Sequence, residues 1–147
     1  MATKASAVTA WEALFRAQVA VMRRLSAEFP TNEISLVEYD VLFNLARHAE
    51  RAMRIRDLVD DLLITQPSVS RLVDRLAARG LITKSPDPRD ARGVVVALTD
   101  DGYDLFRRVA VEHSASISTA VGSALTEPEL AHLTALCDKL RAGVKRR

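Results

Sequence analysis

The stretch TQPSVSRLVDRLAARGLI, residues 65–82, places hydroxyl and guanidinium groups on one side of a predicted helix. At 3.6 residues per turn, one narrow stripe of this helix is apolar and consists of Val69, Leu72, Val73 and Leu76. The opposite side carries Pro67, Arg71, Asp74 and Arg75, flanked by Ser68 and Ser70. Short hydroxyl side chains let the helix backbone approach a ligand closely. A planar guanidinium can donate two parallel hydrogen bonds to guanine O6 and N7. This face therefore has the chemistry to bind a polyanion.

Positive charge gathers in the same part of the chain. Residues 65–92 contain six Lys or Arg and three Asp, so the stretch carries +3, whereas the whole chain carries +2 and the remainder −1. Such clustering is the expected footprint of a nucleic-acid-binding surface. An ordinary amphipathic helix with a solvated charged face would show the same pattern, so charge alone leaves both interpretations open.

The bulk composition indicates one globular domain. The chain has 147 residues, of which 48% are hydrophobic and 27% charged. No run approaches the roughly 20 apolar residues of a membrane span, and the N-terminus lacks the apolar core of a secretory signal. The single cysteine, Cys137, excludes an intramolecular disulfide, so we expect a reducing, cytoplasmic location.

Capping signals divide the chain before residue 65 into helices. A long first helix is predicted to end at Pro30, and Ser35 with Glu38 forms a capping box that begins the next helix. A short helix follows around residues 55–62, and Thr65 is predicted to be the N-cap of the helix introduced above.

A hairpin and two further helices follow that helix. Gly80 is predicted to end it as a left-handed C′ residue. The strand-like runs LITK and VVVAL flank SPDPRDARG, which predicts a hairpin with a charged nine-residue tip. Thr99 then caps a long helix, and Thr126 with Glu129 forms a second capping box before the last helix.

Helix, tight turn, helix and two-stranded hairpin is the element order of a winged helix-turn-helix. In that motif the second helix enters the major groove of DNA with its N-terminal residues facing base edges. The predicted fold class is mainly α with a small β-hairpin wing, a winged helix-turn-helix with N- and C-terminal dimerisation helices.

Two motifs resemble the MarR family of transcriptional regulators. DARGVVVALT, Asp90–Thr99, matches the family's wing signature of Asp-x-Arg, five residues and Leu-Thr. QPSVSRLVDRLAARGLI is similar to the recognition helix of SlyA-like members, and the helix order matches from about Trp11 to Leu140.

The resemblance implies a single MarR-like domain over residues 1–147 that forms a homodimer on a pseudo-palindromic operator. We expect no cofactor and no metal. Dimerisation helices would span 8–30 and 100–143, and a DNA-binding lobe would span 35–98. Pro67, Ser68 and Arg71 would meet bases or phosphates in the major groove, and Arg92 would enter the minor groove. The full set of expected DNA-binding residues is Thr65, Gln66, Pro67, Ser68, Ser70, Arg71, Arg75, Arg89, Asp90 and Arg92. Asp90 would orient the wing tip through an ion pair with a nearby arginine.

Relatives often respond to a small aromatic, frequently phenolic, effector. Residues on the helices that would line such a site are Trp11, Phe15, Tyr39 and Phe43, although aromatic residues at helical spacing also form ordinary core. Cys137 continues an apolar stripe, which favours a structural role over redox sensing. The three histidines are too scattered for a metal motif.

Three rival functions remain at the level of sequence. An enzyme is disfavoured because the chain contains no glycine-rich phosphate loop, Gly-x-Ser-x-Gly or His-Glu-x-x-His motif. A winged-helix protein-interaction module is the second rival, and the arginines on the helix and wing argue against it. The third is a protein that binds DNA without sequence preference.

Overall fold

The computed structural model describes residues 1–62 and 66–145. The chain divides into two compact units: Phe29–Glu112 forms one, and Met1–Glu28 together with His113–Arg147 forms the other. Helix α5 (Asp100–Ile117) contributes residues to both units. The expected DNA-binding lobe, residues 35–98, falls within the first of these units.

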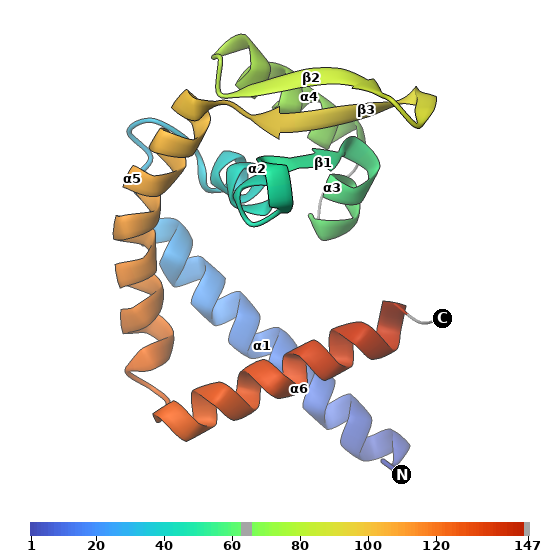
Figure 1. The fold of residues 1–147 in the computed structure, drawn as a ribbon. Coiled ribbons are helices and arrows are strands. Elements are labelled where there is room, and N and C mark those ends of the chain that lie inside the picture. Colours follow the sequence, from blue (N-terminus) through green and yellow to red (C-terminus); the bar gives the residue numbers. More distant parts are fainter. Residues whose placement is uncertain (63–65, 146–147) are drawn as a thin grey trace. The chain divides into compact units, whose positions relative to one another are not determined.

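The unit Phe29–Glu112 combines helices with a small sheet (Figure 1). Before α5 its elements in chain order are α2 (Leu36–Ala46), η1 (Ala49–Arg51), β1 (Ala52–Arg54), α3 (Ile55–Asp61), α4 (Gln66–Ala78), β2 (Ile82–Asp87) and β3 (Asp90–Leu98). The mainly α fold with a β-hairpin wing is thereby confirmed.

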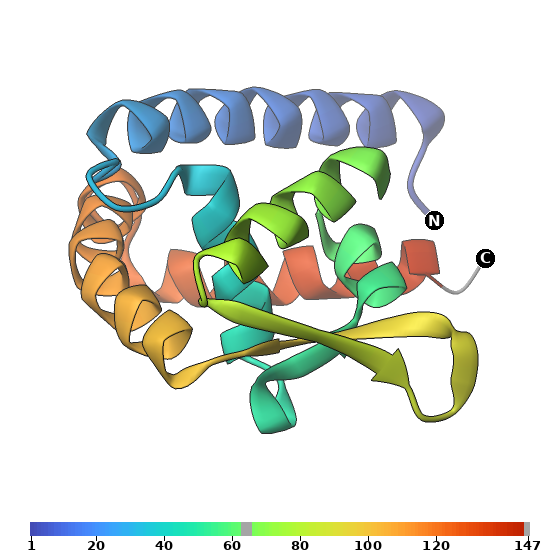
Figure 2. The ribbon, with the colours of Figure 1, turned by 90° about the horizontal axis from the view of Figure 1, so that it is seen from above.

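The sheet differs from the prediction in two respects. It has three antiparallel strands in the order β1-β3-β2, and the third strand, β1, was not expected. The prediction of a nine-residue tip is wrong, because β2 and β3 extend into that segment and leave only Pro88 and Arg89 between them. Figure 2 shows the closed end of this hairpin projecting beyond the helices of the same unit. The wing is thus a longer and more regular ribbon than its turn-rich sequence indicates.

The predicted apolar stripe of α4 faces the core of this unit. Val69, Val73 and Leu76 are fully buried and Leu72 almost so, beside buried residues of α2, α3 and β3. Complete burial of one such side chain contributes about 1.5–3 kcal/mol to folding. The core therefore fixes which side of α4 faces solvent.

The predicted helix boundaries in this unit are confirmed by hydrogen bonds. Ser35 Oγ accepts from the Glu38 N–H at 3.2 Å, and Glu38 Oε1 accepts from the Ser35 N–H at 3.0 Å. Gly80 has φ +73°, and the Leu81 N–H bonds the Leu76 carbonyl at 3.1 Å, as in a Schellman motif. The predicted cap Thr65 lies outside the described residues.

Thr99 ties the end of α4 to the start of α5. Its hydroxyl donates to the Gly80 carbonyl at 2.7 Å and accepts from the Gly102 N–H at 3.0 Å, which confirms Thr99 as the helix cap. Gly102 lets the start of α5 lie close to the backbone of Leu81, since a Cβ at that position would lie 2.0 Å from the Leu81 carbonyl oxygen. The end of α4, the base of the wing and the start of α5 thus share one tightly packed junction.

The second unit consists of helices. It contains α1 (Lys4–Glu28), the end of α5, the π-helical turn η2 (Ser118–Gly122) and α6 (Glu127–Lys145). The second capping box is confirmed, because Glu129 Oε2 accepts from the Thr126 N–H at 2.8 Å and Thr126 Oγ1 from the Glu129 N–H at 3.4 Å. These bonds lower the pKa of Glu129 below its usual value. Among the described residues of α6, none is buried.

Candidate nucleic-acid interface

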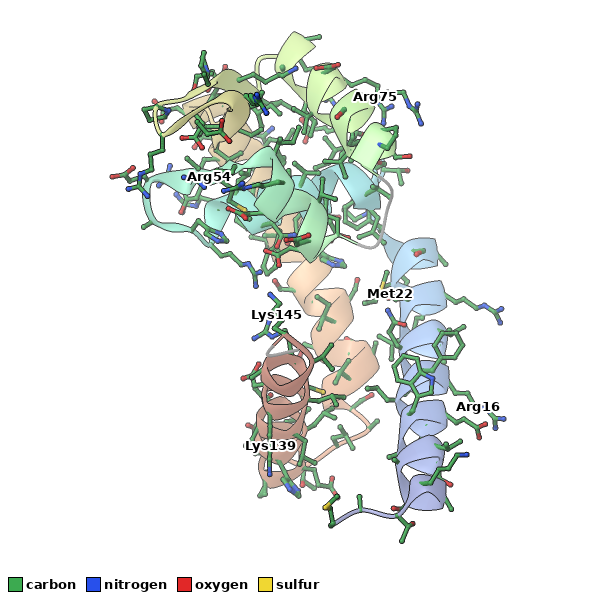
Figure 3. The ribbon with its side chains drawn as sticks, turned by 90° about the vertical axis from the view of Figure 1, so that its right-hand side faces the viewer. Arg16, Met22, Arg54, Arg75, Lys139 and Lys145 are labelled. Carbon is green, nitrogen blue, oxygen red and sulfur yellow. The ribbon has the colours of Figure 1, made fainter. Side chains whose placement is uncertain are left out.

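The solvent face of α4 carries the residues that the sequence predicts. Pro67, Arg71 and Arg75 are exposed, while Ser68 and Ser70 at the start of the helix are half-buried. Arg71 Nη2 lies 3.4 Å from Ser68 Oγ, and Figure 3 shows the Arg75 side chain directed away from the helix. Thr65 lies outside the described residues, and Gln66 is the first residue of α4. The described part of this face offers two guanidinium groups and short polar side chains to a ligand.

An acidic residue also occupies this face and is neutralised by the wing. Asp74 is exposed between Arg71 and Arg75, and its Oδ1 lies 2.6 Å from Lys84 Nζ on β2. The two side chains are 62% and 40% exposed. This ion pair links the solvent face of α4 to the hairpin, a contact that the sequence analysis did not predict.

The wing exposes two arginines near its tip. Arg89, Asp90 and Arg92 are all exposed. Asp90 Oδ1 accepts a hydrogen bond from the Arg92 N–H at 3.0 Å. The prediction that Asp90 forms an ion pair with an arginine is wrong for the described part of the chain. There, the Asp90 carboxylate accepts a hydrogen bond from a backbone N–H of the wing instead of pairing with an arginine side chain.

The ion pair near the tip is formed by Asp87 instead. Asp87 Oδ2 lies 2.7 Å from Arg54 Nε, and the aspartate side chain is only 4% exposed. Its Oδ1 accepts a hydrogen bond from the Arg89 N–H at 2.9 Å. Sequence analysis missed Arg54 and Asp87 because 32 intervening residues separate them, although an Asp-Pro pair beside a tight turn is a recognisable signal.

The four candidate effector residues form one aromatic pair in each unit. On α1, the ring centres of Trp11 and Phe15 are 5.8 Å apart, and both side chains are more than half exposed. On α2, Tyr39 and Phe43 are 6.4 Å apart. Tyr39 is buried and packs against Phe106, with the two ring centres 5.5 Å apart. Burial raises the pKa of the Tyr39 hydroxyl. Tyr39 is thus part of the core, whereas the other three side chains reach solvent.

Cys137 lies in an apolar groove between α1 and α6. The groove has a volume of about 410 Å³ and is lined by Ala7, Ala10, Trp11, Leu14, Leu133, Leu136, Cys137 and Leu140. Cys137 is exposed in the isolated chain and lies among hydrophobic neighbours. Within residues 1–62 and 66–145, no group of three His, Cys, Asp or Glu side chains could hold a metal ion. None of the helices described is long and apolar enough to cross a bilayer.

Comparison with known proteins agrees with this geometry. A sequence profile of the MarR family matches residues 33–93. The HTH-type transcriptional regulator PecS of Dickeya dadantii is 31% identical over 128 residues, covering 86% of this chain and 76% of that protein.

Solved structures extend the similarity to nearly the whole chain. The MarR family regulator Sco3205 of Streptomyces coelicolor, solved in complex with DNA, is 26% identical with a TM-score of 0.77 and covers 97% of this chain and 90% of its own. Bordetella bronchiseptica BpsR, described for regulation of its DNA binding by 6-hydroxynicotinic acid, is 26% identical with a TM-score of 0.75, covering 90% and 98%. These relatives are regulators rather than enzymes, and the chain belongs to the MarR family of transcriptional regulators.

Proposed function

We propose that this protein is a homodimeric, sequence-specific DNA-binding repressor. One observation carries the proposal: the core fixes α4 so that Arg71 and Arg75 face solvent, and the adjoining wing exposes Arg89 and Arg92. A helix of this kind fits the major groove, and arginines on a wing fit the enhanced negative potential of a narrow minor groove. The DNA complex of the relative Sco3205 supports the same assignment.

The roles of the two elements differ. Pro67, Ser68 and Arg71, at the start of α4, would contact bases or adjacent phosphates and provide sequence preference. Arg92 would enter the minor groove, and Arg89 would contact phosphate, so that both increase affinity more than selectivity. The protein would act in the cytoplasm, where a bacterial operator lies.

A homodimer is supported by the exposed apolar surface of α1 and α6. Trp11 is 59% exposed, and Leu136 and Leu140 are each 51% exposed, along one groove. An exposed apolar patch of this kind marks an association surface, and a two-fold dimer presents two recognition helices to half-sites about 10 base pairs apart. The dimer surface proposed here is this groove between α1 and α6.

The dimer is tested by a charge placed in the groove. Leu136→Glu should give monomers by light scattering, because an unpaired carboxylate would be buried on association. Ala135→Glu is the control, since helical periodicity places Ala135 on the opposite side of α6 from the groove. Equal assembly of both variants and the wild type would refute the dimer surface.

DNA recognition is tested by selecting duplexes from a random-sequence pool with the wild-type protein. Fluorescence anisotropy would then compare a selected duplex with its scrambled version at several salt concentrations. Selective binding that weakens steeply with salt is expected. Equal, weak binding to every duplex would refute sequence-specific regulation and favour a non-specific DNA-binding protein or a docking module.

A small aromatic acid or phenol is the proposed effector, with the exposed pair Trp11 and Phe15 on α1 as its aromatic contacts. The regulation of BpsR by 6-hydroxynicotinic acid supports this ligand class. Thermal-shift screening against aromatic acids should reveal stabilisation that accompanies loss of DNA binding. The absence of any shift across the panel would count against an aromatic effector.

A further inference from the structure

One buried carboxylate organises the tip of the wing. Asp87 is the last residue of β2, and its side chain is 4% exposed. One carboxylate oxygen contacts Arg54 Nε at 2.7 Å, and the other accepts a hydrogen bond from the Arg89 N–H at 2.9 Å. Asp87 therefore connects an arginine outside the hairpin with the backbone of the two-residue tip.

The ion pair joins the two edge strands of the sheet. Arg54 ends β1, where it pairs with Val95 of β3, and Asp87 lies on β2 at the opposite side of β3. Gly93 of β3 leaves the space that the carboxylate occupies, because a Cβ there would lie 3.1 Å from Asp87 Cβ and 3.3 Å from Asp87 Oδ2. The side chains of β1 and β2 thus meet where the central strand has none.

Irregular strand pairing near the tip makes the contact of Asp87 more important there. Regular register between β2 and β3 breaks between Pro86 and Asp87, and Asp87 pairs directly with Asp90. Pro86 and Pro88 also provide no N–H group to the hairpin. Near the tip, the carboxylate of Asp87 therefore replaces part of the backbone pairing that regular strands would have.

We propose that Arg54 and Asp87 are positioning residues that fix the direction of the wing tip for DNA binding. This inference rests on the proposed function and adds to it two residues outside the expected contact set. A tip that is ordered before binding loses less conformational freedom when Arg89 and Arg92 contact DNA. The pair thereby raises affinity for all sequences, while base preference stays with α4.

Two substitutions alter the carboxylate or its space in different ways. Asp87→Asn keeps the shape of the side chain and removes its charge, and Gly93→Ala changes no charge but crowds the carboxylate. Each variant should bind a duplex selected by the wild-type protein roughly three- to tenfold more weakly, the cost of ordering a side chain on binding. The ratio of affinities for the selected and scrambled duplexes should stay unchanged. Thermal unfolding confirms that each variant is folded before it is compared.

A double-mutant cycle separates positioning from a general structural effect. In an Arg89→Ala/Arg92→Ala background, Asp87→Asn should cause no further loss of DNA affinity, because the groups that it positions are gone. Additive losses would overturn the proposal. A greater loss from Arg54→Gln than from Asp87→Asn, with a salt slope lower by about 1.8 for the two wings of the dimer, would also overturn it, since Arg54 would then contact phosphate itself.

Amide hydrogen exchange tests the inference without DNA. The Arg89 amide should exchange about tenfold faster in Asp87→Asn, whereas the Val96 amide in the buried part of β3 should not change. Unchanged exchange at Arg89 would refute the role of Asp87 even if the wild-type protein selected no duplex. Failure to select a duplex refutes the proposed function instead, so the two failures are distinguishable.

Discussion

Replacing Asp74 by Asn should make DNA binding tighter and more sensitive to salt. Asp74 is the acidic group on the solvent face of α4, and it holds Lys84 at 2.6 Å. Removing the carboxylate deletes one repulsive charge from the proposed DNA surface and releases the Lys84 ammonium to contact a phosphate. Both changes favour binding to any sequence.

The magnitude follows from counterion release. Each additional phosphate contact steepens the dependence of log K on log salt by about 0.9, which is about 1.8 for a dimer with two wings. Between 50 and 200 mM salt, the variant should therefore lose about 12-fold more affinity than the wild type. Folding stability should fall by less than about 1 kcal/mol, because both partners of the ion pair are substantially exposed.

Asp138→Asn is a matched control for this experiment. Asp138 contacts Arg141 at 2.9 Å, and its side chain is 61% exposed, compared with 62% for Asp74. The control removes the same net charge from α6 rather than from α4. Anisotropy titrations of all three proteins at four salt concentrations, with light scattering to check assembly, measure the slopes.

Two results would refute this reasoning. Equal slopes for Asp74→Asn and Asp138→Asn would mean that only net charge matters and that the face of α4 is not beside phosphate. Weaker binding of Asp74→Asn to the selected duplex alone, with an unchanged slope, would mean that Asp74 accepts a hydrogen bond from a base such as cytosine.

Three further predictions concern specificity, packing and pH. Arg71→Ala should cost about 1–3 kcal/mol of binding and relax base preference, whereas Arg92→Ala should weaken binding and keep most discrimination, as measured on selected and scrambled duplexes. Gly102→Ala should destabilise the fold by about 3 kcal/mol, because its Cβ would overlap the Leu81 carbonyl. Gly80→Ala should destabilise it by about 1 kcal/mol, because an alanine is strained in the left-handed backbone conformation of Gly80. Urea unfolding measures both changes. Burial lowers the pKa of His113, so the unfolded chain binds that proton more readily, and stability should fall as pH drops below about 6.5; His113→Gln should remove this part of the pH dependence.

Each of these predictions has a contradicting outcome. Equal loss of discrimination from the two arginine variants would refute their different roles. Equal unfolding midpoints of the two glycine variants would mean that a Cβ at Gly102 costs no more than the left-handed backbone at Gly80, contrary to the prediction. A wild-type protein whose stability relative to His113→Gln rises on acidification would contradict the sign of the histidine effect.

Local signals explain why much of the fold could be predicted from the sequence. Ser35 and Glu38 cap α2 through bonds that join residues three apart, and Gly80 ends α4 because its backbone needs a positive φ. The apolar spacing of α4 likewise determines which of its sides is buried. From these, the exposed arginines of α4 follow directly.

The missed features depend on residues that are distant in sequence or locally atypical. The strand β1 has three residues and follows Glu50 and Arg51, which both have positive φ, a conformation rare outside glycine. The guanidinium of Arg51 lies 3.4 Å from the centre of the Tyr103 ring, a tertiary contact that helps hold this turn. The short wing tip was missed for a similar reason: Pro86 and Asp87 are typical of turns, but pairing with β3 extends the strand through them.

Helix α6, which has no buried residue, would link gene dosage to operator occupancy in the proposed dimer. None of its nineteen residues is buried within a single chain, and in the proposed dimer a second protomer would cover its apolar groove. Below the dissociation constant of the proposed dimer, the concentration of paired protomers rises with the square of total protein. Doubling expression would then raise operator occupancy nearly fourfold at low saturation, whereas a monomeric regulator would give only a doubling. A modest change in synthesis or degradation of this protein would therefore produce a disproportionate change in transcription of its target genes.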